Sequence, residues 1–285
     1  MALDDLPPQP PLRFPQGQAY AERVLEKSRP VLLSHRRLLD QAYGPDYWQK
    51  VDVFLPENLR GASLPILIFA HGGSWIAGYK EWMAFMAPAV TALPAVFVSV
   101  SYRLAPAIKF PGPFDDCVSA VAWVYEHAEA IGGDRSRLYV GGHSAGAHLM
   151  ALVALRGDAL MARGLPHDVV KGCIAASAPF DLRLSDPGQT TENHRTLLAD
   201  LLDAEAASPI VHVSPAAPPF LISVGEFDFP PLREQAERMR QALSAASGSV
   251  VLQDLKDHDH FDTSERSVEP GHPWLAQVAR LLGLS

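Results

Sequence analysis

Residues 138–150 read LYVGGHSAGAHLM, and this stretch decides the fold. An apolar run at 138–140 is followed by a Gly-x-Ser-x-Gly pentad at 142–146 and then by helix formers that begin at Ala147. The pattern predicts a strand, a sharp turn and a helix, with Ser144 at the apex of the turn. The flanking glycines let the strand and the helix approach closely. We expect the serine hydroxyl to lie beside the free N–H groups of the first helical turn.

Further apolar runs on both sides of this stretch predict the rest of a sheet, and segments of helical spacing separate them. Strands that are apolar throughout and alternate with helices are typical of a parallel sheet with both faces covered. We therefore expect an α/β fold, with a mostly parallel, twisted sheet of about eight strands and helices on both faces. The expected strands lie at residues 51–55, 65–70, 95–101, 138–141, 172–177, 220–224 and 250–255.

The chain divides into an N-terminal arm at residues 1–50 and one α/β domain at residues 51–285. The arm begins with a proline-rich stretch, and its apolar spacing then predicts two short helices between Gln18 and Leu39 that break near Pro30. Because these helices precede the first strand, we expect them to lie over the core as a lid or as a wall of the entrance.

A second covering element is expected inside the α/β domain, at residues 181–215. This segment is the least regular part of the domain. A polar loop at 185–194 is followed by a leucine-rich stretch at 195–203 that predicts a helix. We interpret the segment as a small cap inserted over the carboxyl ends of the strands, where ligands bind on such sheets.

Composition and charge exclude several classes of partner. The formal net charge is −8, and no lysine- or arginine-rich run occurs, so a nucleic acid or an anionic membrane would find no electrostatic partner. No apolar run approaches the ~18 residues of a membrane helix, and the first residues do not resemble a secretory signal. Cys117 and Cys173 lie in apolar segments and are expected to be buried thiols. These features predict a cytoplasmic location.

A serine hydroxyl is a weak nucleophile at neutral pH, so Ser144 needs a base, and the base needs an orienting carboxylate. Glu226 and Asp228 follow one predicted strand, and His258 and His260 follow the next. We favour Asp228, because a loop beyond the strand has room to turn its side chain toward a histidine. We favour His260, because the bulky phenylalanine after it could anchor the loop.

A glycine pair supplies a second element of the same chemistry. The predicted strand at 65–70 is followed by a His-Gly-Gly-Ser-Trp sequence that contains Gly72, Gly73 and Ser74. Adjacent glycines let the backbone turn its N–H groups toward a neighbouring site, as an oxyanion hole requires. The expected donors are the amides of Gly72, Gly73 or Ser74, together with that of Ala145.

The alternating histidines and aspartates at residues 257–262 also suit a metal ion. Successive side chains of an extended segment point to opposite sides, so one face would offer two ligands at best. We therefore expect neither a metal nor another cofactor. His143 and His148 flank Ser144, and we expect both side chains to point away from it.

A substrate pocket is expected beside the glycine pair. Ser74 and Trp75 directly follow the glycines, and Phe180 follows another predicted strand, so we assign these three residues to the pocket. Tyr79 and Trp82 are further aromatic residues that could line an apolar pocket, although aromatics at helical spacing are more often part of the core.

With these residues in view, the chain resembles the α/β-hydrolase superfamily. Within it, the chain is similar to the esterases related to hormone-sensitive lipase and to the kynurenine formamidase (arylformamidase) group. The resemblance implies a triad of Ser144, Asp228 and His260, with Gly72, Gly73 and Ala145 as oxyanion donors. The motifs that carry it lie at residues 71–75, 101–106, 142–148 and 260–262.

The resemblance implies a serine hydrolase that cleaves small carboxylic esters through an acyl-enzyme. An arylformamidase that acts on amides such as N-formylkynurenine is the alternative. Ser74 and Trp75 after the two glycines look like the formamidase side, because the lipase-like esterases typically carry a third glycine there. A non-catalytic ligand receptor is a further alternative, but all three triad residues are present. The expected partner is a small ester or amide, and a homodimer is a candidate assembly.

Overall fold

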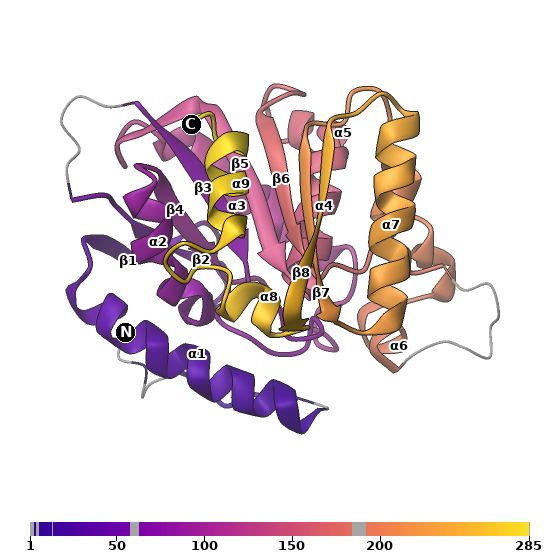
Figure 1. Cartoon of the computed structure of the whole chain (residues 1–285), viewed down its shortest axis with the longest axis horizontal. Helices are drawn as coiled ribbons and strands as arrows, with labels where there is room; N and C mark the ends of the chain where they lie inside the picture. Colours follow the sequence, from indigo (N-terminus) through magenta and orange to yellow (C-terminus); the bar gives the residue numbers. More distant parts are fainter. Residues whose placement is uncertain (1–2, 4–5, 13, 58–62, 184–191, 285) are drawn as a thin grey trace.

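The computed structural model describes residues 3, 6–12, 14–57, 63–183 and 192–284. Eight strands form one sheet in the order β1-β2-β4-β3-β5-β6-β7-β8 (Figure 1). The β1–β2 and β2–β4 pairs are antiparallel, and all other neighbours are parallel. The predicted α/β fold with a mostly parallel sheet is confirmed. The strands are β1 (Arg37–Ala42), β2 (Lys50–Phe54), β3 (Leu64–Ala70), β4 (Val96–Val100), β5 (Gly133–His143), β6 (Val170–Ala176), β7 (Phe220–Phe227) and β8 (Val250–Asp259).

Helices cover both faces of the sheet (Figure 1), and the chain also contains short 3-10 helices. The α-helices are α1 (Pro15–Ser34), α2 (Ala87–Ala92), α3 (Gly112–His127), α4 (Ala145–Leu155), α5 (Gly157–Met161), α6 (Glu192–Leu197), α7 (Pro230–Ala245), α8 (Asp262–Glu265) and α9 (Pro273–Leu281). The 3-10 helices include η2 (Lys80–Met86), η4 (Leu201–Ala204) and η5 (Pro209–His212).

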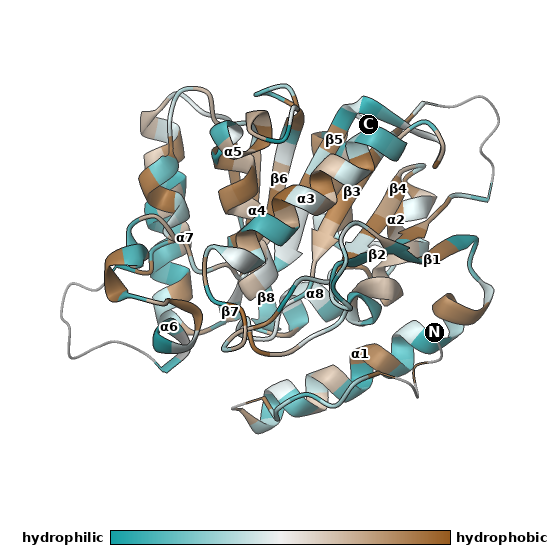
Figure 2. Ribbon diagram, turned by 180° about the vertical axis from the view of Figure 1, so that it is seen from behind, coloured by the Kyte–Doolittle hydropathy of each residue, from teal (hydrophilic) through white to brown (hydrophobic). Residues whose placement is uncertain are grey.

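The central strands are buried on both faces because their side chains alternate between two hydrophobic cores. In β3, Ile66 and Ile68 belong to the core formed with α3, α4 and α7. Leu67 and Phe69 belong to the core formed with α1, η2, α2 and α9. This explains the continuous apolar run in the sequence and the hydrophobic colouring of the sheet interior in Figure 2.

The N-terminal arm differs from the prediction of two short helices. Residues 15–34 form one continuous helix, with Pro30 in its last turns. A proline removes one backbone hydrogen bond, and near the end of a helix only a few residues remain beyond the missing bond. The buried face of α1, which includes Tyr20 and Val24, packs in the same core as η2 and holds the helix together across the proline.

The predicted cap segment also differs in detail. Its polar loop falls largely on residues 184–191, which lie outside the described residues. The helix predicted at 195–203 is interrupted, because α6 ends at Leu197 and η4 begins at Leu201. Asp200 starts η4 by accepting a hydrogen bond from the Leu202 amide (2.9 Å), and Asp203 accepts one from the Asp200 amide (3.2 Å). This reciprocal capping box starts a new helical turn.

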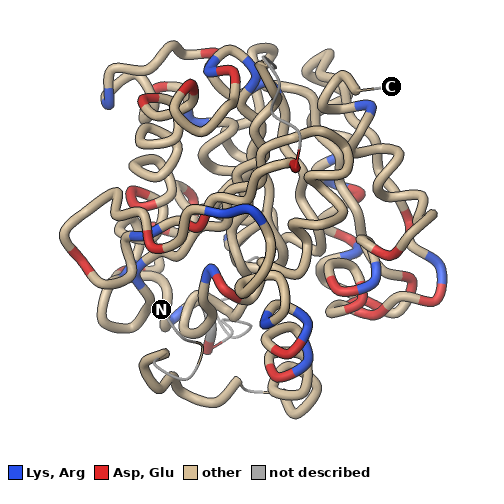
Figure 3. The backbone as a smooth tube through the Cα atoms, turned by 90° about the vertical axis from the view of Figure 1, so that its left-hand side faces the viewer, with Lys and Arg blue, Asp and Glu red and all other residues tan. Residues whose placement is uncertain are grey.

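Charged residues of both signs are interspersed along the backbone (Figure 3). Several are paired inside the fold, such as Arg103 with Asp116 (2.7 Å). Lys80 is buried with Asp52 (3.0 Å) and ties η2 to β2. Over the described ranges, none of the helices has the length and apolar character needed to cross a membrane.

Candidate active site

Ser144 occupies the predicted turn between β5 and α4, with φ 53° and ψ −119°. This left-handed conformation is strained for a serine, and such strain is found where function requires a particular placement. The neighbouring glycines are needed for space. A Cβ at Gly142 would lie 2.4 Å from the Gly146 carbonyl carbon, and one at Gly146 would lie 2.3 Å from the Ala70 and His71 carbonyl oxygens. The turn can form because glycine, which has no side chain, occupies both of these positions.

The structure brings Ser144, His260 and Asp228 together at the carboxyl ends of three parallel strands. Ser144 Oγ lies 3.0 Å from His260 Nε2, and His260 Nδ1 lies 2.8 Å from Asp228 Oδ1. His260 directly follows β8, and Asp228 directly follows β7. A carboxylate can only accept, so Nδ1 carries the proton and Nε2 is free to accept the serine proton.

The environment keeps Asp228 ionised. Burial would raise the pKa of its carboxyl group, but hydrogen bonds from His260, Ser177 and the Phe229 amide hold the pKa below its ordinary value. An ionised Asp228 can orient the imidazole and stabilise the cation that forms when His260 takes a proton.

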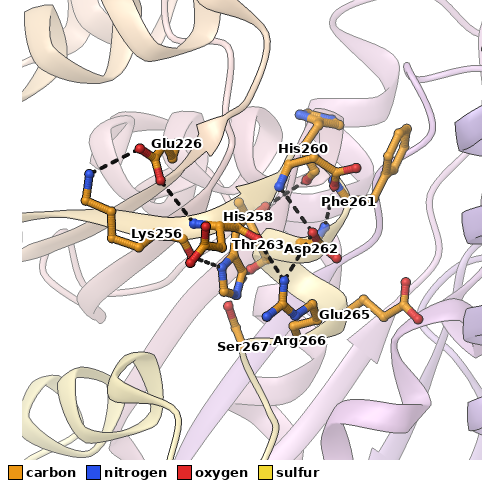
Figure 4. Close-up of polar contacts among 12 residues, drawn as sticks. Glu226, Lys256, His258, His260, Phe261, Asp262, Thr263, Glu265, Arg266 and Ser267 are labelled. Carbon is orange, nitrogen blue, oxygen red and sulfur yellow. Dashed lines mark hydrogen bonds and ion pairs between the residues drawn. The ribbon is translucent and has the colours of Figure 1, made fainter.

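The two alternative residues lie elsewhere, as Figure 4 shows. Glu226 accepts a hydrogen bond from the Asp257 amide (3.2 Å) and pairs with Lys256 at the surface. His258 Nδ1 donates to the Lys256 carbonyl (2.6 Å), and its Nε2 lies 3.2 Å from that of His272. The structure thus directs Asp228 and His260, rather than Glu226 and His258, toward Ser144.

The glycine-pair loop passes beside Ser144 in an unusual backbone conformation. Gly73, Ser74 and Trp75 have φ values of 115°, 54° and 63°. A Cβ at Gly73 would come within 2.1 Å of the Ala77 carbonyl oxygen, so this position requires glycine. Gly73, Ser74 and Ala145 line the cavity next to Ser144.

Gly72 lies differently from the other predicted donors, since it packs against the turn and is not among the cavity-lining residues identified within the described ranges. A Cβ at this position would lie 3.2 Å from Ser144 Cβ and 2.9 Å from His143 Nδ1. Gly72 therefore provides the close contact between the glycine-pair loop and the serine turn.

The cavity beside Ser144 has a volume of about 240 Å³. Ser74 and Trp75 lie on its wall as predicted, and so does Trp82. Phe180 does not, because its side chain is fully buried in the core and the preceding Pro179 lines the cavity instead. Gln235 accepts from the Phe180 amide (2.7 Å) and so helps to fix this backbone. The lining residues are Leu12, Phe14, Gly17, Tyr20, Gly73, Ser74, Trp75, Trp82, His143, Ser144, Ala145, Pro179, Phe229, Pro231, Leu232, His260 and Phe261.

Part of the wall comes from the N-terminal arm and α1, whose individual residues the sequence did not reveal. The Phe14 ring lies 5.5 Å from that of Phe229. The Tyr20 hydroxyl lies 2.9 Å from Ser264 Oγ, and Arg23 pairs with the buried Glu265 (2.8 Å). These contacts dock α1 on α8, the short helix that follows His260.

The two histidines that flank Ser144 have separate partners. His143 Nε2 donates to the His260 carbonyl (2.8 Å), and His143 is buried and is among the residues that line the cavity. His148 Nδ1 accepts from Trp75 Nε1 (3.2 Å), and its Nε2 donates to the Ala207 carbonyl (2.7 Å). Burial lowers the pKa of His143 to about 3 and that of His148 to about 4. Both are therefore neutral at pH 7.

Two further hydroxyl residues approach the triad, and sequence reasoning missed both. Ser177 donates a hydrogen bond to Asp228 Oδ2, and Thr263 lies 2.7 Å from Ser177 Oγ. Neither residue lies in a sequence motif that would identify it as part of an active site. In the described part of the chain, no cluster of three or more His, Cys, Asp or Glu residues is arranged to hold a metal ion.

Comparison with known proteins places this geometry in a family. A family model described as the alpha/beta hydrolase fold matches residues 67–262. The kynurenine formamidase of Danio rerio is 30% identical over 273 residues, which are 91% of this chain and 86% of that protein. Esterase LipC of Mycobacterium tuberculosis is 32% identical over 245 residues, which are 79% of this chain and 61% of that esterase.

A solved structure shares the architecture. The carboxylesterase EstE1, cloned from a metagenomic library, superposes with a TM-score of 0.74 at 25% identity, covering 94% of this chain and 97% of its own. The strained serine turn and the order of the strands are consistent with this fold, and the family model matches more than half of the chain. The chain therefore belongs to the alpha/beta hydrolase family.

Proposed function

We propose that this chain is a carboxylesterase that hydrolyses small, uncharged esters through an acyl-enzyme on Ser144. The observation that carries the proposal is the continuous hydrogen-bonded path from Ser144 through His260 to Asp228, which opens into an apolar cavity. The same path would be of no use to a protein that only binds a ligand.

The reaction follows from the geometry in two halves. His260 Nε2 takes the proton of Ser144 as Oγ attacks the ester carbonyl, and the oxyanion is held by the amides of Gly72, Gly73 or Ser74 together with that of Ala145. The imidazolium of His260 then protonates the leaving alcohol. In the second half, His260 activates water, which attacks the acyl-enzyme and restores Ser144. Asp228 holds the imidazole throughout.

The cavity supports a small and uncharged substrate. Its volume of about 240 Å³ is modest, since pockets for drug-sized ligands usually have roughly 300–1,000 Å³. Within the described residues, its lining includes six aromatic side chains of phenylalanine, tyrosine and tryptophan, and no lysine, arginine, aspartate or glutamate. A short acyl chain and an aryl or small alkyl alcohol match this surface, whereas a buried ionic group would lack a partner.

A series of p-nitrophenyl esters with acyl chains of increasing length tests the proposal, with Ser144→Ala as the blank. We expect kcat/KM to be highest for the shortest chains and to fall as the chain outgrows the cavity. Ser144→Ala should show no turnover above the uncatalysed rate. Undiminished hydrolysis by that variant would refute the proposal.

An arylformamidase is the second candidate function. The relative from Danio rerio favours it, and so does the Ser74-Trp75 sequence after the glycine pair, with Trp75 on the cavity wall. The same residues would transfer the formyl group to Ser144, with His260 protonating the leaving aromatic amine. N-formylkynurenine and phenyl acetate should be compared with one enzyme preparation. A higher kcat/KM for the formamide would select this function.

We also propose a cytoplasmic location. Cys117 and Cys173 are buried, free thiols, and unpaired cysteines are usual in reducing compartments. Fractionation of the source cells with an antibody to the protein tests this location. Recovery with the secreted or membrane fraction would contradict it.

A further inference from the structure

The carboxylate of Asp228 receives hydrogen bonds on both oxygens. Oδ1 accepts from His260 Nδ1 (2.8 Å) and from the Phe229 amide (2.7 Å). Oδ2 accepts a short hydrogen bond from Ser177 Oγ. Ser177 follows β6, the strand next to the one that ends before Asp228, so the sheet itself brings the hydroxyl to the carboxylate.

Ser177 is held in an unfavourable backbone conformation. Its φ is 51°, in the left-handed region, and its side chain is 1% exposed. Its amide donates to the Ser223 carbonyl (2.8 Å), which fixes it against β7. A left-handed conformation is energetically unfavourable for a residue other than glycine. Such a cost persists where the surroundings determine the geometry, and it recurs at functional sites.

Thr263 lies behind Ser177 and is fully buried. Its Oγ1 is 2.7 Å from Ser177 Oγ and 2.8 Å from the His260 carbonyl oxygen. Three contacts involve these hydroxyls: Ser177 with Asp228, Ser177 with Thr263, and Thr263 with the His260 carbonyl. Each hydroxyl has only one proton to donate, so two protons serve the three contacts. His143 Nε2 already donates to the His260 carbonyl (2.8 Å). This carbonyl has two lone pairs and can accept from both His143 and Thr263, so the single Thr263 proton serves either the carbonyl or Ser177 Oγ, while the Ser177 proton goes to Asp228.

We propose that Ser177 and Thr263, the hydroxyl pair, are positioning residues that fix Asp228 against His260 and share its negative charge. The inference rests on the proposed function of Ser144, Asp228 and His260. Hydrogen bonds in a buried chain polarise one another, and a bond to a charged acceptor is stronger than a neutral one. Neither hydroxyl residue is among the described residues that line the cavity, so both act through Asp228.

The hydroxyl pair should influence rate and pH dependence rather than substrate binding. A donor on Oδ2 draws charge from Oδ1 and moderates the pull of Asp228 on the His260 proton. Without it, an ionised Asp228 would favour the imidazolium more strongly. The acid limb of the pH profile of kcat/KM, which reports protonation of the base, would then move to higher pH.

Four variants of the full chain separate this role from packing. Ser177→Gly removes the hydroxyl and relieves the left-handed backbone, whereas Ser177→Ala removes the hydroxyl and keeps the strain. Thr263→Val keeps the side-chain shape without the hydroxyl, and Thr263→Ser keeps the hydroxyl. The substrate is p-nitrophenyl acetate, and product formation is followed in a pH-stat between pH 5 and 9.

We expect kcat to fall roughly tenfold in both Ser177 variants and several-fold in Thr263→Val. KM should stay within about twofold of the wild type, and the acid limb should move up by about half a unit. Thr263→Ser should resemble the wild type. Ser177→Gly should unfold at the same or a higher temperature than Ser177→Ala, so its lost activity cannot be assigned to a weakened fold.

A wild-type kcat and an unmoved acid limb in Ser177→Gly would overturn the inference. Ser144→Ala is measured in parallel, so that a failure of the proposed function can be distinguished from a failure of the role proposed for the hydroxyl pair. Retained hydrolysis by Ser144→Ala would refute the proposed function itself. An inactive Ser144→Ala beside a wild-type-like Ser177→Gly would refute only the role of the hydroxyl pair.

Discussion

One wall of the cavity comes from segments at the carboxyl ends of β3, β5, β6, β7 and β8, and another comes from the N-terminal arm and the first turns of α1. The sheet wall carries Ser144, His260 and the glycine-pair loop. The arm wall carries Leu12, Phe14, Gly17 and Tyr20. The family model matches residues 67–262 and so includes the sheet wall but not the arm wall.

The two walls are also held in place differently. The sheet wall grows out of strands that are hydrogen-bonded to their neighbours in the sheet, and the central strand β3 is buried along its whole length. The arm wall is held by side chains: the buried face of α1 packs against η2, and the Gln9 amide group both donates to and accepts from the Gly78 backbone (2.8 and 2.7 Å). We therefore expect the sheet wall to determine the chemistry and the arm wall to determine which substrates reach it.

The largest effect is expected from Asp228→Asn on the sheet wall. The amide no longer fixes the imidazole tautomer or stabilises its cation, so kcat should fall by roughly 10³–10⁴-fold. Glu226→Gln is the matched control, because Glu226 lies at the surface and contacts Lys256. Steady-state hydrolysis of p-nitrophenyl acetate measures both. Equal losses in the two variants would mean that Asp228 has no special role.

A second effect should appear in stability against pH, because three buried neutral histidines lie close to the sheet wall: His71 before the glycine pair, His143 before Ser144, and His148 in α4. Burial lowers the pKa of His71 and His148 to about 4 and that of His143 to about 3. The unfolded chain binds more protons between about pH 4 and 6.5, so stability is lost as the pH falls through this window. At pH 5 each histidine should cost roughly 2 kcal/mol.

Urea unfolding at pH 7 and pH 5 measures this loss. His148→Gln, which removes one of the titrating groups, should have a shallower dependence on pH than the wild type. A wild-type free energy of unfolding that is the same at both pH values would show that these histidines do not titrate on unfolding as described.

A smaller effect is expected on the arm wall. Phe14→Ala removes the ring that contacts Phe229 across the cavity, so KM for aryl esters should rise about three- to tenfold with kcat little changed. Leu33→Ala, on the helix that follows Phe14, is the control, because Leu33 is 71% exposed and is not a lining residue. A large fall in kcat for Phe14→Ala would contradict the expectation that the arm wall affects substrate binding and not the chemical step.

The sequence was sufficient to predict the serine turn, because the close approach of strand and helix leaves room only for glycine at residues 142 and 146. The order of Ser144, Asp228 and His260, each after a strand, was equally readable. These features are local, or they follow from the rule that parallel strands end at one edge.

Other features depend on tertiary contacts and could not be read locally. Ser177 and Thr263 meet only because β6, β7 and α8 converge. Phe180 was assigned to the cavity by residue type, but the backbone directs it into the core. Pro30 predicted a break in the arm, but the packing of α1 against η2 keeps the helix continuous.

The central claim is that Ser144 is the nucleophile on the sheet wall. The most direct measurement is labelling of the native protein with a fluorophosphonate probe, followed by mass spectrometry of the proteolytic peptides. We expect one adduct, on Ser144, that is absent from the Ser144→Ala variant and from protein that is unfolded before labelling. No adduct on the active protein, or an adduct on another residue that abolishes hydrolysis, would contradict it.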